Sequence, residues 1–193
     1  MGSAGAPPRL NATAASLLGF LHDGPMTGWE LVRVAMDRIG DFWSLTRSQV
    51  YRELAAMEAG GLIAAGERGP RDRRPYGLTD AGRHAFAAWA AVEPGDETIR
   101  MPILLMVSFG RHVTPHRLAA HLEAHRAAHA ARLDRYEAFA RAADAETRDP
   151  DPEAGDDAPY RRATLEFGLA YERAVLAWFD RLDEVLPGRP NPD

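Results

Sequence analysis

The chain has 193 residues, of which 46% are hydrophobic and 26% are charged, as in an ordinary globular protein with one large or two small domains. The absence of cysteine excludes disulfides, thiolate metal sites and cysteine nucleophiles. The longest apolar run, residues 101–107, is far too short to span a bilayer, and residues 1–10 lack the blocks of a signal peptide. We therefore expect a cytoplasmic protein with flexible tails over residues 1–10 and 188–193.

The net charge of −5 is distributed unevenly along the chain. Residues 1–90 hold ten arginines and nine acidic residues, whereas residues 144–157 alone hold seven acidic residues and one arginine. Affinity for phosphate depends on the local charge rather than on the total. The negative net charge of the whole chain therefore does not exclude a nucleic-acid partner.

Two helix starts precede residue 40, each with a residue that favours the cap position. Asn11 is expected to cap a helix over residues 12–22, which the sequence Asp-Gly-Pro at 23–25 ends. Thr27 is expected to cap a second helix, which runs to about Ile39.

A third helix is expected to begin after Thr46. Thr46 and Gln49 have the spacing of a capping box, in which each side chain bonds the backbone amide of the other residue. The helix should end near Glu58, before the pair of glycines at 60–61. Its inward-facing residues are expected to be Val50, Leu54 and Met57.

The next segment has the pattern of a hairpin followed by a helix. Strands are expected over residues 62–68 and 74–78, and Thr79 should cap a helix through Trp89. The acidic Glu-Pro-Gly-Asp stretch at 93–96 marks a domain boundary. Helix, hairpin and helix in this order predict a winged helix-turn-helix DNA-binding domain over residues 11–92.

Beyond that boundary the sequence is helical, which predicts a mostly α protein with a C-terminal helical domain over residues 97–187. We expect helices over about 99–109, 115–143 and 159–186, with an acidic linker over 144–158. The last helix is apolar on two faces, and three helices offer too few neighbours to cover both. This pattern predicts dimerisation. The two faces carry Leu165, Leu169, Leu176 and Phe179 on one side and Tyr171, Val175, Trp178 and Leu182 on the other.

Several histidines fall at spacings that place imidazoles on one helix face, as in some metal sites. No carboxylate is spaced along the sequence to complete such a site, so we expect no metal and interpret His125 and His129 as neutral residues of the dimer seam. The i, i+4 sets are His112 with His116, and His121 with His125 and His129. The seam itself consists of Leu118, Leu122, His125, His129, Leu133, Tyr136, Ala140 and Ala143.

Five short stretches in the first 85 residues, in this order, resemble the PadR family of bacterial transcriptional regulators. These stretches are Leu17–Leu21, Gly24–Leu31, Gln49–Leu54, Glu58–Ile63 and Tyr76–Gly82. The second half resembles the longer, virulence-activator-like branch of the family, through Pro102–Phe109, Phe167–Arg173 and Trp178.

The resemblance implies a homodimer, held by its C-terminal helices, whose two winged helices grip a palindromic operator. It also implies a repressor that a small, often aromatic, molecule releases from DNA. One departure concerns the second helix, where the family commonly has tyrosine after the glycine and this chain has Trp29. A phosphate contact from a tyrosine hydroxyl is therefore in doubt at this position, although the indole N–H can replace it.

The candidate DNA-binding residues lie on the third helix and on the hairpin. The first turn of a recognition helix faces base edges, where arginine can bind guanine and glutamine can bind adenine. Here the residues with that reach are Arg47, Ser48, Gln49 and Arg52. Tyr51 either donates to a phosphate or packs half-buried. The hairpin residues expected to contact phosphates or the minor groove are Arg68, Arg71, Arg73 and Arg74. The alternative is a solvated helix face and a hairpin whose arginines pair with Asp72.

An effector pocket is a weaker prediction, because aromatic and methionine side chains at helical spacing also form ordinary cores. The candidate effector-binding residues are Trp43, Trp89, Met106, Phe109, Tyr171 and Trp178. We find no phosphate-cradling glycine loop and no nucleophile motif, so no enzyme activity and no cofactor are expected. Two alternatives to a DNA-binding repressor stay open: a winged helix used for protein–protein assembly, and a sensor of hydrophobic ligands.

Overall fold

The computed structural model describes residues 10–69, 74–96, 99–148 and 157–186. The chain divides into two compact units, Met1–Glu97 and Thr98–Asp193, and each is described by itself. Among the described residues, no helix is long and apolar enough to cross a membrane.

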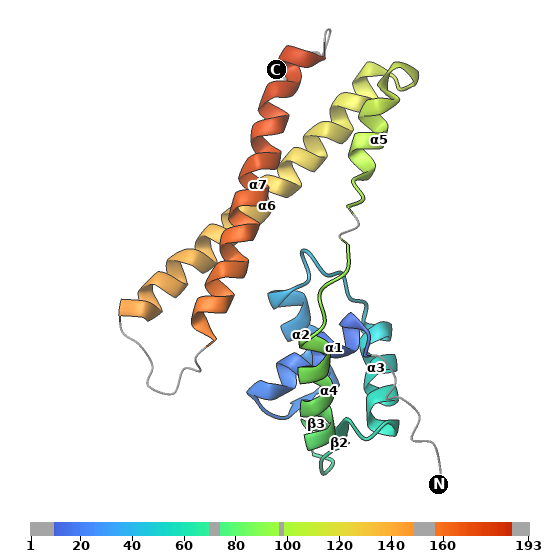
Figure 1. Ribbon diagram of the computed structural model, residues 1–193. Coiled ribbons are helices and arrows are strands. Elements are labelled where there is room, and N and C mark those ends of the chain that lie inside the picture. Colours follow the sequence, from blue (N-terminus) through green and yellow to red (C-terminus); the bar gives the residue numbers. More distant parts are fainter. Residues whose placement is uncertain (1–9, 70–73, 97–98, 149–156, 187–193) are drawn as a thin grey trace. The chain divides into compact units, whose positions relative to one another are not determined.

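The described residues of the first unit form four α-helices and a small antiparallel sheet (Figure 1). The helices are α1 (Ala12–Phe20), α2 (Gly28–Arg38), α3 (Arg47–Ala59) and α4 (Asp80–Ala90), with a 3-10 turn, η1, at Leu21–Asp23. The strands are β1 (Met26–Thr27), β2 (Ile63–Ala65) and β3 (Pro75–Leu78), in the order β1-β3-β2. Helix, turn, helix and hairpin therefore follow one another as predicted.

The predicted helix caps of this unit are present. The Asn11 side chain accepts a hydrogen bond from Ala14 N at 2.8 Å. Thr27 and Thr46 each cap the following helix within a capping box, with Glu30 and Gln49 as the respective partners. Each cap satisfies backbone amides that a helix start leaves without partners, which explains why these helices begin where the sequence indicates.

The sheet differs from the prediction in two respects. Its strands are shorter, because β2 ends at Ala65 rather than at Arg68, and β3 begins at Pro75. Pro75 has no amide hydrogen, so it cannot donate the hydrogen bond that would extend the ladder. The two-residue strand β1, which pairs Met26 with Tyr76, is too short to produce a periodic sequence pattern and was not predicted.

The core of the first unit lies between α1, α2 and α3. The inward face predicted for α3 is confirmed, since Val50, Leu54 and Met57 are all buried. The other buried members of this core are Ala14, Leu17, Leu18, Phe20, Leu21, Leu31, Val32, Ala35 and Ile63.

A close approach fixes the start of α4. The Thr79 hydroxyl accepts from Gly82 N at 3.1 Å, and its hydrogen is shared between the carbonyl oxygens of Gly61 and Leu62. A Cβ atom at position 82 would lie 2.1 Å from the Leu62 carbonyl oxygen, so only glycine fits there. Gly61, with φ of +70°, supplies the left-handed turn that ends α3 and leads into β2.

The second unit is a pair of long helices with a short one beside them. The elements are α5 (Pro102–Ser108), a 3-10 turn, η3 (Gly110–His112), α6 (Pro115–Arg148) and α7 (Ala158–Val185). Helices α6 and α7 run in opposite directions, and α5 packs against α6 (Figure 1). The buried apolar residues shared by the three helices are Ile103, Leu122, Phe179 and Leu182.

Two helix boundaries of this unit were predicted wrongly. Helix α5 starts at Pro102 rather than near residue 99. A proline disfavours helical backbone angles in the residue before it, and Met101, which precedes Pro102, is extended. Helix α6 continues to Arg148, so the segment expected as an acidic linker begins inside a helix. Alanine at 142, 143 and 145 favours helix, and the next proline comes only at residue 150.

Candidate nucleic-acid interface

Helix α3 is buried on one side and polar on the other. Arg47 and Ser48 in its first turn are exposed, as are Tyr51 and Arg52 one turn further on. Because the buried side packs on α1 and α2, the exposed side keeps a fixed orientation relative to the first unit. This is the arrangement that a recognition helix needs in order to enter the major groove.

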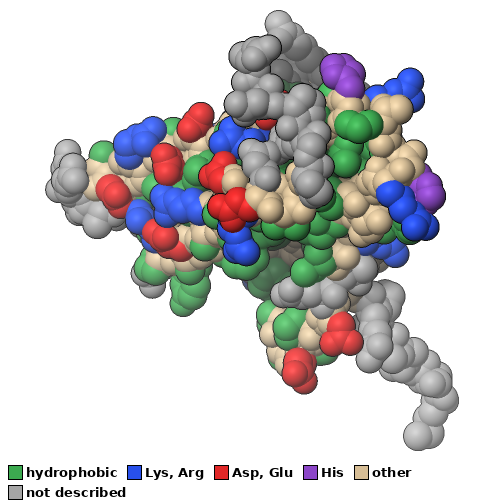
Figure 2. Space-filling model, turned by 90° about the horizontal axis from the view of Figure 1, so that it is seen from above, with side chains coloured by type: hydrophobic (Ala, Val, Ile, Leu, Met, Phe, Trp, Pro, Cys, Tyr) green, Lys and Arg blue, Asp and Glu red, His purple; other side chains and the backbone are tan. Residues whose placement is uncertain are grey.

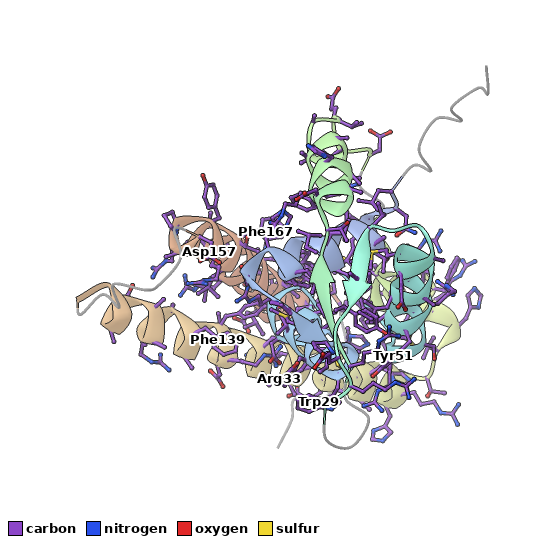
Figure 3. The ribbon with its side chains drawn as sticks, turned by 90° about the horizontal axis from the view of Figure 1, so that it is seen from below. Trp29, Arg33, Tyr51, Phe139, Asp157 and Phe167 are labelled. Carbon is purple, nitrogen blue, oxygen red and sulfur yellow. The ribbon has the colours of Figure 1, made fainter. Side chains whose placement is uncertain are left out.

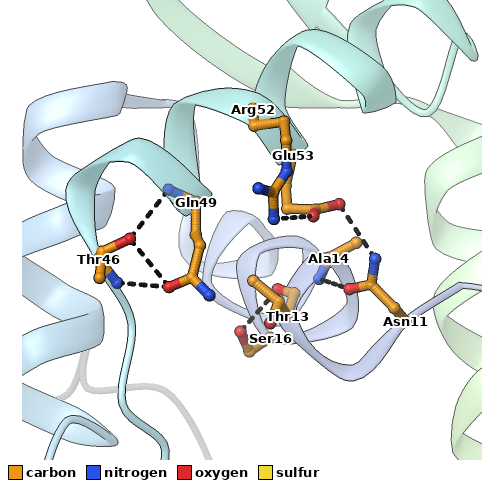
Figure 4. Close-up of polar contacts among 8 residues, drawn as sticks. All are labelled: Asn11, Thr13, Ala14, Ser16, Thr46, Gln49, Arg52 and Glu53. Carbon is orange, nitrogen blue, oxygen red and sulfur yellow. Dashed lines mark hydrogen bonds and ion pairs between the residues drawn. The ribbon is translucent and has the colours of Figure 1, made fainter.

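The first turn of α3 is held by the Thr46–Gln49 capping box (Figure 4). Gln49 N donates to Thr46 Oγ1 at 3.2 Å, and the Gln49 side-chain oxygen accepts from Thr46 N at 2.8 Å. The box presents Arg47 and Ser48 from a rigid helix start. It also occupies the side-chain oxygen of Gln49, a residue predicted to bind a base edge.

Arg52 is tied to a chain of polar contacts that the sequence did not indicate (Figure 4). Its guanidinium lies 3.5 Å from the carboxylate of Glu53, whose side chain is only 13% exposed. The other oxygen of Glu53 accepts a hydrogen bond from Asn11 Nδ2 at 3.1 Å. Asn11 thus caps α1 and also holds the carboxylate beside Arg52, which connects residues 42 positions apart.

Tyr51 and Trp29 lie on neighbouring helices at the exposed edge of the first unit (Figure 3). The Tyr51 ring packs against the start of α2, so closely that a Cβ atom added at Gly28 would lie 2.7 Å from the ring atom Cε1. The Tyr51 side chain nevertheless remains 46% exposed. It therefore both packs and offers its hydroxyl to solvent. Trp29 is 54% exposed, and the Arg33 guanidinium lies 5.7 Å from the centre of its ring. Arg33 was missed, although its i, i+4 spacing from an aromatic residue was a readable signal.

The hairpin arginines are only partly described. Arg68 is exposed on the segment after β2, and Arg74 precedes β3, where it pairs with Glu58 of α3 at 3.3 Å. Arg71 and Arg73 lie outside the described residues. The ion pair of Arg74 connects the start of β3 to the end of α3.

The six predicted effector residues are divided between the two units. Trp43 and Trp89 belong to the first unit, where the Trp89 ring lies tilted against that of Phe86 with centroids 5.9 Å apart, whereas the other four belong to the second. There, Met106 and Trp178 are half-buried, and Phe109 and Tyr171 are exposed. The second unit has an apolar hollow of about 440 Å³ and a polar one of about 270 Å³, and none of the six lines either.

The polar hollow lies between the second half of α6 and the first half of α7. Figure 2 shows arginine and acidic side chains lying next to one another at this end of the helix pair. Arg162 is bound by Glu166 and Asp144, and the hydrogen bonds to these two carboxylates, that of Glu166 first, raise its pKa. Since arginines and acids alternate around the hollow, it has no strong preference for an anion.

The histidine interpretation needs correction. His125 is exposed, because it stands about 60° around the helix from the buried Leu122 and so lies at the rim of the seam. His129 is 7% exposed, but it lies in the contact between α6 and α7 of the same chain, not at a seam between two chains.

The partner of His129 is a carboxylate that spacing along the sequence could not reveal. Glu172 of α7, 2% exposed, binds His129 Nδ1 at 2.5 Å and Arg132 Nε at 2.8 Å. Among the described residues, no group of three or more histidines and carboxylates is placed to hold a metal ion. The side chains of His129 and Arg132 on α6 and Glu172 on α7 form a hydrogen-bonded polar cluster, called here the polar tie, between the two long helices.

A winged helix joined to a helical unit is an arrangement typical of DNA-binding transcriptional regulators. A model of the transcriptional regulator PadR-like family matches residues 17–88, and one of the virulence activator alpha C-terminal domain matches residues 99–187. The chain belongs to the PadR family of transcriptional regulators, in the longer branch that carries this second domain.

Two curated relatives agree with this assignment. A probable transcriptional regulator of Mycobacterium tuberculosis is 28% identical over 186 residues, which are 89% of this chain and 95% of that protein. The negative transcriptional regulator PadR of Bacillus subtilis is 29% identical over 98 residues, which are 49% of this chain and 54% of PadR. The family and these relatives are transcriptional regulators, not enzymes.

Solved structures share the fold. Bacillus subtilis PadR in complex with operator DNA has a TM-score of 0.70 at 20% identity, covering 89% of this chain and 97% of that one. PadR in complex with p-coumaric acid has a TM-score of 0.66, also at 20% identity, covering 89% and 96%. The Vibrio cholerae virulence activator AphA has a TM-score of 0.69 at 22% identity, covering 88% and 95%. The predicted fold, mostly α with a winged helix-turn-helix, is confirmed.

Proposed function

We propose that this PadR-family regulator is a cytoplasmic homodimer that binds a palindromic operator and represses transcription until a small hydrophobic or aromatic effector releases it. The observation that carries the proposal is the fixed, exposed polar side of α3. Arg47 and Ser48 stand in its capped first turn, and Tyr51 and Arg52 follow on the next. A polar outer side is ordinary for a helix packed on a core, and here the capped first turn holds the side chains with hydrogen-bonding reach where a recognition helix meets base edges.

In this proposal, α3 reads base edges while the hairpin and α2 hold the backbone. The hairpin arginines, Arg68, Arg71, Arg73 and Arg74, contact phosphates or the minor groove, which favours arginine where it is narrow. Relatives support this assignment, since PadR of Bacillus subtilis is seen in complex with operator DNA. Each phosphate contact should add about one unit to the slope of binding against salt concentration.

The homodimer is supported by apolar side chains that the second unit leaves exposed. Phe167 of α7 is 67% exposed and stacks against Tyr171, and Phe139 of α6 is also exposed (Figure 3). Leu104 and Leu105 add to this exposed apolar surface on α5. A second copy of the chain would cover these faces, and a two-fold dimer is the form of protein that matches a palindromic operator.

The effector proposal has support of a different kind. PadR of Bacillus subtilis is seen in complex with p-coumaric acid, an aromatic molecule. The candidate residues are Trp43, Trp89, Met106, Phe109, Tyr171 and Trp178, all of them apolar or aromatic. An effector bound there would release DNA only if it bound the DNA-incompetent form of the dimer more tightly than the competent form.

The test is fluorescence anisotropy of a labelled duplex from the gene's own upstream region, at two salt concentrations, with a scrambled duplex as competitor. We expect sub-micromolar binding that resists the competitor and weakens with salt. Replacement of both Arg47 and Arg52 by alanine should abolish it, whereas Arg83→Ala, an exposed arginine of α4, is the matched control.

Failure of this protein to bind its upstream region would be followed by selection from a random duplex pool. A pool that yields no enriched site, with a protein shown to be folded, would contradict the proposal. That outcome would favour a winged helix used for protein–protein assembly or a sensor that does not contact DNA.

A further inference from the structure

Gln49 has two tasks that compete for the same atoms. It stands in the first turn of α3, where a recognition helix meets base edges, and its side chain is also half of the capping box (Figure 4). The hydrogen bonds of the cap therefore decide which atoms of its amide remain for DNA.

The cap uses the amide oxygen. Gln49 Oε1 accepts from Thr46 N at 2.8 Å and from Thr46 Oγ1 at 2.9 Å. The orientation of the amide is determined, because a backbone N–H only donates and the atom that faces it must be an acceptor. The hydroxyl of Thr46 has its hydrogen available for Oε1, since it accepts, rather than donates, in its contact with Gln49 N. Two donors thus occupy both lone pairs of the oxygen.

The side-chain nitrogen of Gln49 takes no part in the capping box. Nε2 carries two hydrogens, and within the part of the chain that the structure describes it has no hydrogen-bond partner. A glutamine reads adenine by accepting from N6 with its oxygen while donating to N7 with its nitrogen. Gln49 has no acceptor left for the N6 amino group, so it cannot complete that pair while the cap is intact.

We propose that Gln49 acts as a donor-only reader that selects guanine, with both Nε2 hydrogens directed to O6 and N7. Thymine, with one acceptor at O4, comes second. Adenine can accept one hydrogen bond at N7, but its N6 amino group stands where guanine has O6 and would face the Gln49 amino group, so adenine is disfavoured. Cytosine, which presents only its N4 amino group, is disfavoured most. The inference rests on the proposed function, since it requires α3 to lie in the major groove, and it replaces the adenine contact expected from sequence.

The substitution Gln49→Glu separates the two tasks. Glutamate is the usual partner in a capping box, so one carboxylate oxygen keeps the bonds from Thr46 while the second becomes a new acceptor. The cap survives, and the base with a matching donor is now cytosine, through its N4 amino group. Thr46→Ser retains the backbone and hydroxyl donors and is the matched control.

The experiment is selection from a random duplex pool with the full-length wild type, Gln49→Glu, Gln49→Ala and Thr46→Ser, with the melting temperature of each recorded. We expect one position in each half-site at which the wild type favours guanine over adenine by about tenfold. This position should change to cytosine with Gln49→Glu and lose its preference with Gln49→Ala. Every position should be unchanged with Thr46→Ser.

Each outcome decides between clear alternatives. A wild-type site that neither Gln49 variant alters, or a Gln49-dependent position that is adenine or cytosine, overturns this inference and leaves the proposed function intact. If phosphate repulsion prevents Gln49→Glu from selecting any site, Gln49→Ala provides the same decision. A wild type that selects no site overturns the proposed function itself, so the two failures are distinguishable.

Discussion

The two units of the chain bury apolar side chains to very different degrees. In the first, α1, α2 and α3 close around a core whose leucines are almost fully buried, among them Leu17, Leu31 and Leu54. In the second, the described parts of α5, α6 and α7 share a smaller buried apolar cluster, made of Ile103, Leu122, Phe179 and Leu182. Both units leave some aromatic side chains exposed, among them Trp29 in the first and Phe167 in the second. Three short helices on a sheet can enclose a core, whereas a helix pair has outer faces that only another surface can cover.

The units also differ in where they keep polar groups. The first places them at helix starts, where Asn11, Thr27, Thr46 and Thr79 satisfy backbone amides. The second buries the side chain of Glu172 inside the seam of its helix pair. The first unit thus has the larger buried core, and the second relies in part on a buried polar contact between its two long helices.

The largest effect should come from the closed core. Leu54→Ala removes a buried side chain of α3 and leaves a cavity, and we expect it to lower the free energy of unfolding by about 3 kcal/mol. Chemical denaturation followed by circular dichroism measures this change. A loss below about 1 kcal/mol would mean that the core can collapse around the gap and is less rigid than its burial indicates.

The buried polar tie of the second unit should come next. Glu172→Ala leaves His129 and Arg132 without their carboxylate, and we expect a loss of about 2 kcal/mol, below that of a fully buried pair because Arg132 is partly exposed. Replacement of His129 by leucine together with Glu172 by methionine should restore most of the stability. If the double variant is as unstable as the single one, the tie is needed for packing itself rather than for pairing.

The apolar surface of the second unit should affect assembly more than folding. Phe167→Asp places a charge on an exposed aromatic face, and we expect the dimer dissociation constant to rise about tenfold or more with unchanged helix content. Sedimentation at several concentrations measures the constant. Arg181→Ala, exposed on the same helix, is the control, and an equal effect of both substitutions would remove Phe167 from the interface.

The smallest effect should come from a helix start of the first unit. Asn11→Ala removes the cap of α1 and the hydrogen bond to Glu53, with an expected loss of about 1 kcal/mol in the free energy of unfolding. Asn11→Asp keeps an oxygen for the cap but sets a carboxylate against Glu53. The aspartate variant should therefore keep the stability of α1 better than alanine does, while it weakens DNA binding if Glu53 orients Arg52.

Much of the fold follows from local signals. Asn11, Thr46 and Thr79 were read as caps because each side chain bonds an amide three residues away, and such short-range chemistry is visible in sequence. The buried side of α3 was equally predictable from the spacing of its apolar residues.

The contacts that sequence reasoning missed join distant residues. Glu53 meets Asn11 across 42 positions, and Glu172 meets His129 across 43. No pattern along the chain marks such a pair, because the separation depends on how the helices cross. Gln49 is a different case, because the sequence predicted both its part in the capping box and its contact with a base. Only the structure shows that the capping box uses the side-chain oxygen, which limits the contacts left for a base.

The contact at Gly82 has a mechanical consequence for the first unit. The start of α4 is locked to the turn after α3 by the Thr79 hydroxyl and by a glycine with no room for even a methyl group. Helix α4 therefore cannot turn about its own axis without carrying β2 and the end of α3 with it. A displacement of the start of α4 would therefore act directly on the turn that ends α3, through the Thr79 hydroxyl and the Leu62 carbonyl.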